Sequence, residues 1–142
     1  MFKHLSPSIA ARGIMMCAIA FSLGACATVT ESSSRVSIQQ LKGAHLAFID
    51  NHTRSASATP APWDQASFES EVAKVTQQFT DAEAAVPKAV PARKVFIKNS
   101  AGLFQRDAAL VRKQHSLSPS FAANKKKQLQ QNYDLFLQQT SN

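Results

Sequence analysis

The chain has 142 residues, a formal net charge of +7 and two cysteines, Cys17 and Cys26. This length fits one small domain. The sequence contains no GxSxG, no HExxH and no glycine-rich phosphate loop, and Glu69 and Glu71 are too close in sequence to face each other on a helix, so we expect no catalytic residue and no cofactor.

The N-terminal segment has the order of charged and apolar residues that is typical of a secretory signal. Lys3 and Arg12 are basic, no acidic residue precedes Glu31, and an apolar run follows at residues 14–23. The run is too short to span a bilayer core of ~30 Å. We predict that residues 1–25 are a signal peptide and take no part in the fold.

Leu23-Gly24-Ala25-Cys26 comes directly after the apolar run. This motif resembles the lipobox of bacterial lipoproteins, a resemblance that covers the signal and Cys26 only. It implies transfer of diacylglycerol to the Cys26 thiol, cleavage before Cys26 and acylation of the new amine. Ala27 is not the aspartate associated with inner-membrane retention, so the resemblance implies an outer-membrane lipoprotein that faces the periplasm.

Ordinary signal cleavage after Ala27 is the alternative, because Ala25-Cys26-Ala27 also has small residues at the two required positions. It would give a soluble periplasmic protein. Cysteine usage favours the lipobox, since lipidation of Cys26 and loss of Cys17 leave no free thiol in an oxidising compartment. The same processing excludes redox chemistry and cysteine-based metal sites from the mature protein.

After the cysteine, residues 26–35 are small and polar, and we interpret them as a flexible tether. Residues 36–142 are then expected to form the domain. Its first helix is predicted from Val36 to about Thr53, weakened by Gly43, because glycine inside a helix costs about 1 kcal/mol against alanine. Three- and four-residue steps place six residues on one face: Ile38, Leu41, His45, Phe48, Ile49 and His52. Ser55–Pro62 is predicted to be a loop.

The second helix is the clearest element. Asp64 can cap it through a side-chain oxygen, and Pro87 and Pro91 end it, because proline lacks the amide proton and clashes with the preceding turn. Steps of four and three residues connect its apolar positions, which predicts one buried stripe. These positions are Phe68, Val72, Val75, Phe79, Ala82 and Val86.

Two further helices are predicted, from about Ala92 to His115 and after Pro119, where Ser118 precedes proline as a cap residue does. In the third helix, Phe96, Leu103 and Leu110 lie at heptad spacing. Residues expected to flank that line are Val95, Ser100, Phe104, Asp107 and Val111. The face expected for the fourth helix consists of Phe121, Leu129, Tyr133 and Phe136, interrupted by Lys125. Four amphipathic helices with short connections predict an all-α, up-down four-helix bundle.

Charge is unevenly distributed over the predicted mature chain. Residues 26–87 hold four basic and seven acidic residues, whereas residues 88–142 hold ten basic and two acidic ones. Acidic and basic helices could lie side by side and complement each other. Alternatively, helices three and four present a basic surface to anionic lipid, anionic cell-wall polymer or an acidic protein partner. That surface would include Arg93, Lys94, Lys98, Arg106, Arg112, Lys113, Lys125, Lys126 and Lys127. Nucleic acid is not expected as a partner of a secreted, lipid-anchored chain.

Two further pairs of residues carry candidate chemistry. His45 and His52 share a helix face, but seven residues separate them by ~10 Å, too far to bind one metal ion. We therefore expect no metal and favour partly buried or rim histidines. Asp107 and Lys125 interrupt apolar stripes and would either form an interhelical pair or lie at the bundle edge.

Trp63 follows the predicted loop, and we favour a plug at one end of the bundle over an interaction loop at Pro60–Trp63. The sequence thus predicts a non-catalytic docking protein of the bacterial envelope. An inhibitor or immunity lipoprotein that neutralises a toxin or hydrolase is the first alternative, and an accessory enzyme or ligand carrier is the least favoured.

Overall fold

The structure is a computed structural model that describes the backbone of residues 20–54 and 62–140 and the side chains from residue 33 on within those ranges. The chain divides into two units, residues 1–32 and residues 33–142. The predicted signal peptide belongs to the first unit, and its residues 1–19 lie outside the described residues. All of the described core belongs to the second unit.

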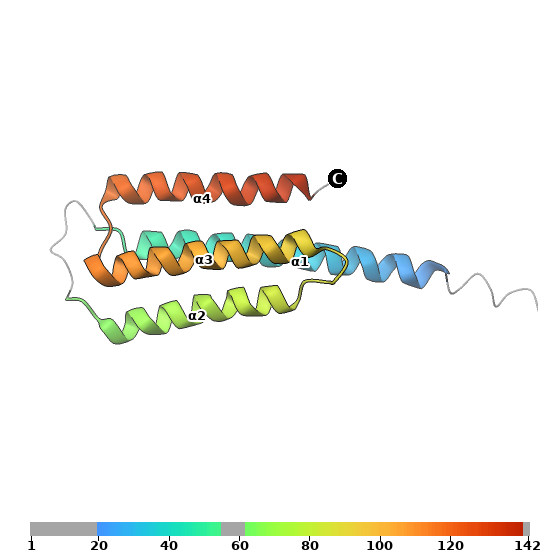
Figure 1. The fold of residues 1–142 in the computed structure, drawn as a ribbon, viewed down its shortest axis with the longest axis horizontal. Helices are drawn as coiled ribbons and strands as arrows, with labels where there is room; N and C mark the ends of the chain where they lie inside the picture. The colour runs from blue at the N-terminus through green and yellow to red at the C-terminus, as the bar shows by residue number, and fades with distance from the viewer. Residues whose placement is uncertain (1–19, 55–61, 141–142) are drawn as a thin grey trace, which may run out of the picture. The chain divides into compact units, whose positions relative to one another are not determined.

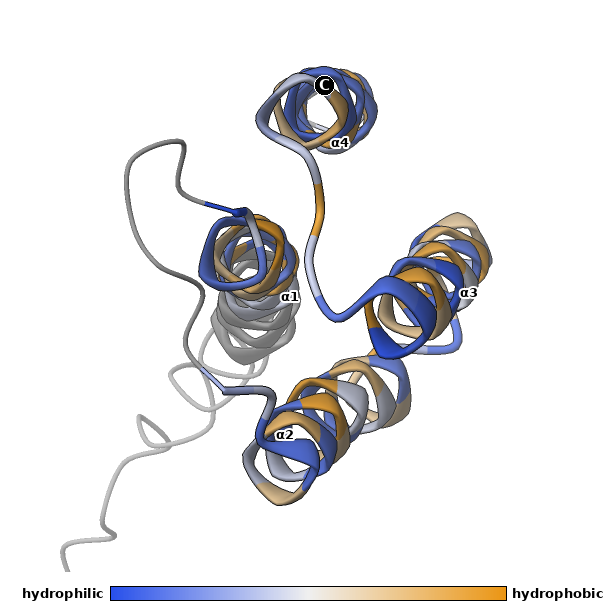
Figure 2. Cartoon of the chain, turned by 90° about the vertical axis from the view of Figure 1, so that its left-hand side faces the viewer, coloured by the Kyte–Doolittle hydropathy of each residue, from blue (hydrophilic) through white to orange (hydrophobic). Residues whose placement is uncertain are grey.

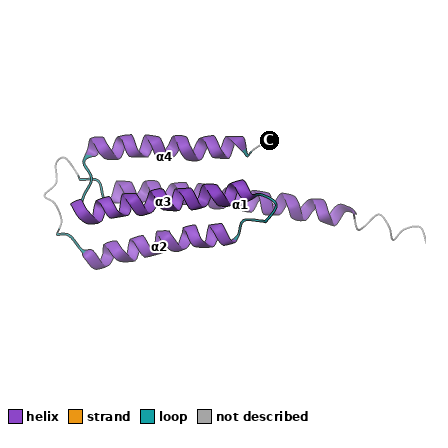
Figure 3. Ribbon diagram, in the orientation of Figure 1, coloured by secondary structure: helices purple, strands orange, loops and turns teal. Residues whose placement is uncertain are grey.

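Four helices make up the described chain: α1 (Ala20–Asn51), α2 (Gln65–Ala84), α3 (Pro91–Gln114) and α4 (Pro119–Gln139). No strand is drawn among the described residues (Figure 3). Within the second unit, α2, α3, α4 and the part of α1 that begins at Ser33 run side by side and alternate in direction (Figure 1). The predicted all-α, up-down four-helix bundle is confirmed.

The bundle has two ends. We call the end where α1 enters the second unit the Ser33 end; α2 and α4 finish there, and α3 begins there (Figure 1). The opposite end, where α1 finishes, is the Asn51 end. There the Leu117 amide donates to the His52 carbonyl (2.7 Å) and the Arg54 amide donates to the Leu117 carbonyl (2.8 Å). These two bonds attach the end of α1 to the α3–α4 connection.

The first helix differs from its predicted extent. α1 continues N-terminally to Ala20, through the segment 26–35 that was expected to be a coil. No proline lies between Ala20 and Asn51, and adding a residue to an existing helix forms a hydrogen bond without a new nucleation cost. The small polar residues therefore extend a helix that the packed turns after Ser33 already hold. Ser34, predicted to belong to the tether, is buried.

Capping residues set the boundaries of α2 and α4 as predicted. The Asp64 side chain accepts a hydrogen bond from the Ser67 amide (3.1 Å) at the start of α2. Ser118 accepts from the Phe121 amide at the start of α4, directly before Pro119. α3 ends at Gln114, and the next residue, His115, has a left-handed φ of 62°, a conformation that stops a helix.

The predicted faces of α1 and α2 form the core. Ile38, Leu41, His45, Phe48 and Ile49 are buried on α1, with His52 partly exposed. The predicted stripe is buried on α2 from Phe68 to Ala82, and Val86, which follows the end of α2, is half-buried. Figure 2, a view along the helix axes, shows hydrophobic segments of α1 and α2 turned toward the interior.

The buried faces of α3 and α4 are rotated from their predicted positions. On α3 the line Phe96, Leu103 and Leu110 is only half-buried. Three buried apolar residues of α3 lie one position further on, Ile97, Phe104 and Val111, and Ala108 is buried beside them. On α4, Leu129 and Tyr133 are buried as expected, but Phe121 is exposed and Phe136 is half-buried, while Ala122 and Leu137 face the core. The rotation brings polar residues of α3 and Lys125 of α4 to the interior.

Candidate functional site

A cluster of three ionisable residues from three helices lies inside the bundle. The His45 Nε2–H of α1 donates to Asp107 Oδ2 of α3 (3.0 Å), and Lys125 Nζ of α4 donates to Asp107 Oδ1 (2.7 Å). The His45 side chain is 0 % exposed, and Asp107 is almost as deeply buried. The interhelical Asp107–Lys125 pair, one of two outcomes weighed from the sequence, is therefore present, and His45 joins it.

Aromatic rings surround the histidine of this cluster. The rings of Phe104 and Phe79 meet His45 edge-on, at centroid distances of 5.4 and 6.4 Å. The His45 Nδ1 atom is buried and has no hydrogen-bond partner among the described residues. Burial alone would raise the pKa of Asp107, but hydrogen bonds from His45 and Lys125, together with their charges, bring this pKa below its ordinary value. Asp107 is thus held as a carboxylate in the interior.

The geometry of the cluster suits packing rather than reaction. A histidine–aspartate pair can act as a base only if the histidine reaches a substrate, and His45 is enclosed. No group of three histidine, cysteine, aspartate or glutamate side chains in the described part of the chain could hold a metal ion. A buried carboxylate that is bonded from two other helices instead favours one alignment of the helices that carry the cluster.

His52 and Trp63 lie at the Asn51 end. His52 Nε2 bonds Glu71 Oε2 of α2 (2.9 Å), whereas His45 bonds Asp107 of α3, so the two histidines do not share a polar partner. The Trp63 ring stacks on His115 (4.6 Å between centroids, 14° between planes) and packs against Phe68 (4.9 Å). Trp63 thus covers one end of the core, as favoured from the sequence. The loop 55–61, on which the inhibitor hypothesis depends, lies outside the described residues.

Five of the nine basic residues expected on a docking surface are buried or paired. Arg93 is buried and donates to the Ser34 hydroxyl, so it is removed from that surface. Lys125 is part of the interior cluster. The other three pair with carboxylates of α1 and α2: Lys94 with Glu83, Arg112 with Glu69 and Lys126 with Asp50.

The Arg112–Glu69 pair is the best formed of the surface pairs. Its two hydrogen bonds, from Nε and Nη2 of Arg112, measure 2.7 and 2.8 Å. A hydrogen bond from Arg112 outweighs partial burial and lowers the pKa of Glu69. Pairs of this kind support the interpretation that acidic and basic helices complement each other across the bundle.

The remaining four basic residues of the predicted surface are exposed: Lys98, Arg106, Lys113 and Lys127. Lys98, Arg106 and Lys113 are separated by eight and seven residues along α3, which places them on one side of that helix. Arg106 Nε donates to the Gly102 carbonyl of its own helix (3.3 Å). We call these three residues the outer face of α3.

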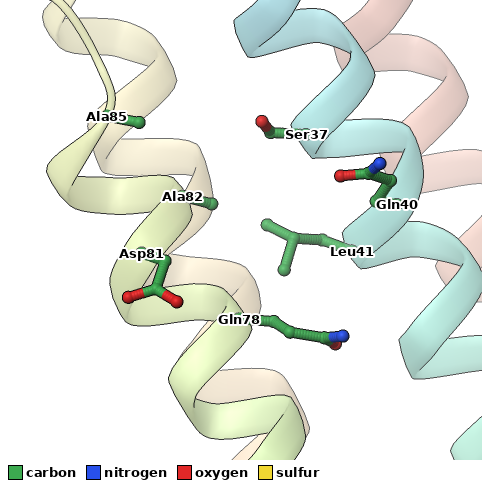
Figure 4. A pocket seen from close by; sticks show the side chains of 7 residues that line it. All are labelled: Ser37, Gln40, Leu41, Gln78, Asp81, Ala82 and Ala85. Atoms are coloured by element: carbon green, nitrogen blue, oxygen red, sulfur yellow. The ribbon is translucent and has the colours of Figure 1, made fainter.

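Two hollows on the bundle are grooves between neighbouring helices. One of about 580 Å³ lies between α1 and α2, where Leu41 points toward α2 and Gln78 toward α1 (Figure 4). Its walls include small residues, Ala82 and Ala85, which leave the space that larger side chains would fill. A second, of about 280 Å³, lies between α3 and α4 and is lined by apolar residues such as Phe96 and Phe136.

Sequence reasoning missed two parts of the interior. Arg93 and Ser34 were not expected inside, although Arg93 falls at the same four- and three-residue steps as Ser100 and Asp107. Tyr133, beside Ser100, is deeply buried, and burial raises the pKa of its hydroxyl to about 12 despite the Ser100 hydroxyl nearby. Arg93 and Ser34 could have been found from the four- and three-residue spacing of polar residues, which an apolar pattern does not count, whereas the burial of Tyr133 was predicted.

No family model, no curated protein and no solved structure matches this chain. None of the helices in the described part of the chain combines the length and apolar character needed to cross a membrane.

Proposed function

We propose that the protein is a lipid-anchored docking protein of the bacterial envelope, attached through Cys26 and facing the periplasm. The observation that carries the anchor is Leu23-Gly24-Ala25-Cys26 placed directly after a short apolar run. Two or three acyl chains on one cysteine give durable attachment, whereas a single chain holds a protein only marginally. Ala27 supports sorting to the outer membrane by the resemblance to lipoproteins.

A docking role without catalysis is supported by how the bundle uses its ionisable groups. His45 and Lys125 both bond the Asp107 carboxylate inside the bundle. The cations of the outer face of α3 have no carboxylate partner among the described residues. An anionic envelope component or an acidic protein partner is the ligand that such a face attracts.

The anchor is tested by changing Cys26→Ser and separating cell membranes from the soluble fraction. We expect the native protein in the outer membrane and the variant as an uncleaved precursor. If the variant is processed and distributes as the native protein does, cleavage after Ala27 is correct and the protein is soluble in the periplasm.

The docking surface is tested by photo-crosslinking in intact cells from a reactive residue placed at Ala109, which is exposed between Arg106 and Lys113. Arg106→Gln with Lys113→Gln should reduce the crosslinked product several-fold. A matched pair, Arg54→Gln with Lys74→Gln, removes the same charge from exposed positions elsewhere and should leave the product unchanged. If the two double variants give equal amounts of crosslinked product, the outer face of α3 is not the docking surface.

A further inference from the structure

Exposed apolar side chains gather at one end of the bundle. Val36, Val95 and Leu135 are 48, 58 and 56 % exposed. Val36 lies three residues after Ser33, Val95 lies four residues after the start of α3, and Leu135 lies four residues before the end of α4. At 1.5 Å per helical residue, each is within about 6 Å of the Ser33 end. Phe121, 40 % exposed, is at the opposite end.

Half-buried aromatic side chains extend this apolar region between α3 and α4. Phe96 stacks on Phe136, with ring centroids 4.0 Å apart and planes at 7°. Both rings line the groove of about 280 Å³, together with Leu103 and Leu135. The apolar surface at the Ser33 end therefore includes residues of three helices, α1, α3 and α4.

Unpaired positive charge accompanies the apolar residues. Lys88, in the α2–α3 connection, and Lys98, one turn after Val95, are both exposed. Two of the acidic side chains at this end are already paired, Glu83 with Lys94 and Asp134 with Lys42. Asp81 is the other acidic side chain that the structure describes there. Exposed apolar residues beside lysines are the composition of surfaces that bind at the headgroup layer of an anionic membrane.

We propose that the Ser33 end of the bundle rests on the membrane surface, with Val36, Val95 and Leu135 at the boundary of headgroups and acyl chains and Lys88 and Lys98 against anionic headgroups. This inference rests on the proposed anchor at Cys26. Seven residues separate Cys26 from Ser33. They belong to α1, and even a fully extended chain would span at most about 3.5 Å per residue, so the anchor holds the Ser33 end within ~25 Å of the lipid. Charge complementarity and this short reach favour the membrane over a protein partner.

This arrangement also assigns different roles to the two basic regions. Lys88 and Lys98 meet the membrane in which the lipid is inserted, whereas Arg106 and Lys113 lie progressively further along α3 from the Ser33 end. The distal part of the outer face of α3 is thus held away from the headgroups, where a periplasmic partner can reach it.

The test measures the depth of single sites in lipidated protein reconstituted into vesicles of phosphatidylethanolamine and phosphatidylglycerol. Cys26 would be the sole cysteine of the mature chain and is blocked by lipid, so Val95→Cys, Leu135→Cys and Phe121→Cys each take one polarity-sensitive fluorophore. We expect blue-shifted emission and several-fold stronger quenching by a shallow, lipid-attached quencher at positions 95 and 135 than at 121. Phe121→Cys is the matched control, since it replaces an exposed apolar residue at the opposite end.

A charge arm separates headgroup attraction from simple proximity. Lys88→Gln with Lys98→Gln should weaken quenching at position 95, and Arg106→Gln with Lys113→Gln should not. In protein that keeps Lys88 and Lys98, quenching at position 95 should also be weaker with vesicles of phosphatidylcholine alone.

The possible failures point to different conclusions. Protein that floats with the vesicles but shows equal quenching at 95, 135 and 121 keeps the anchor and overturns membrane docking, leaving a protein partner for the apolar region. Protein that fails to float overturns the anchor and the docking together.

Discussion

α2 and α3 bury residues at the same four- and three-residue steps but with different chemistry. The buried face of α2 is wholly apolar, from Phe68 to Ala82. The buried face of α3 alternates, with Ile97, Phe104 and Val111 interleaved with three polar residues, Arg93, Ser100 and Asp107. Apolar residues pack in many similar ways, whereas a buried polar group must meet its partner. α2 therefore supplies buried area, and α3 fixes how α1 and α4 align.

Asp107→Ala should have the largest effect, because it leaves His45 and Lys125 without their shared carboxylate. Breaking a buried ionic cluster by removing one partner costs about 3–5 kcal/mol. Chemical denaturation followed by the fluorescence of Trp63, the single tryptophan, measures it. Lys113→Ala, at an exposed position of the same helix, is the control and should change the free energy of unfolding by less than about 0.5 kcal/mol. A comparably small loss for Asp107→Ala would show that the cluster does not form.

Replacing the ionic cluster with apolar residues, like those that α2 buries, should restore the stability that Asp107→Ala loses. The variant His45→Leu, Asp107→Leu, Lys125→Met replaces the whole cluster with apolar residues of similar size. Such replacements are often neutral or stabilising by about 1–4 kcal/mol, so we expect the triple variant to be at least as stable as the native protein. Broader NMR signals in the triple variant would indicate that alignment of the helices was lost. A triple variant that is less stable than Asp107→Ala would contradict the view that the cluster of α3 can be replaced by an apolar face like that of α2.

Tyr133 reports on the interior next to the polar line of α3. It is the only tyrosine, and burial raises its pKa to about 12. At pH 11 about one tenth of the folded protein should carry phenolate, against about nine tenths of the unfolded chain with a pKa of about 10. The neutral hydroxyl thus contributes stability that is present below pH 10 and lost as pH rises toward 12. Ultraviolet absorbance in buffer and in denaturant gives both titrations, and coincident curves would place Tyr133 at the surface.

Acid should weaken the cluster through Asp107. Its pKa is below the ordinary value in the folded protein, so its ionised form contributes stability above about pH 4. That contribution is lost as pH falls below 4 toward the folded pKa. The difference in unfolding free energy between native protein and Asp107→Asn should therefore narrow below pH 4. Asp64 and Glu69 also have lowered pKa values, but both proteins contain them, so their effects cancel in the difference. If the difference in unfolding free energy stays constant below pH 4, the Asp107 carboxylate does not stabilise the protein through its charge.

Removing the surface pair by Arg112→Ala should have the smallest effect. Arg112 and Glu69 are both exposed enough for water and salt to screen their attraction. We expect a change in unfolding midpoint close to the error of measurement, which disappears at high salt. A loss comparable with that of Asp107→Ala would remove the distinction between buried and exposed charge pairs.

The sequence was informative where one chemical signal decided an element. Asp64, Ser118 and the prolines gave the boundaries of α2 and α4, and the unbroken apolar stripe gave the buried face of α2. Asp107 and Lys125 were singled out because each interrupts such a stripe, and the structure joins them. These signals are local, so one sequence was enough to find them.

The face of α3 could not be predicted in the same way. Phe96, Leu103 and Leu110 form one heptad line, and Ile97, Phe104 and Val111 form another beside it. Apolar periodicity cannot choose between adjacent lines. The choice depends on Asp107 meeting His45 and Lys125 from other helices, which is a property of the assembled bundle. The participation of His45 was missed for the same reason, since its partner lies 62 residues away in sequence.

The proposed anchor is tested most directly by the mass of the N-terminal peptide of protein purified from membranes. The account predicts a peptide that begins at Cys26 and carries the added mass of diacylglycerol and an amide-linked acyl chain. A mature chain that begins at Thr28, with no lipid, would contradict it.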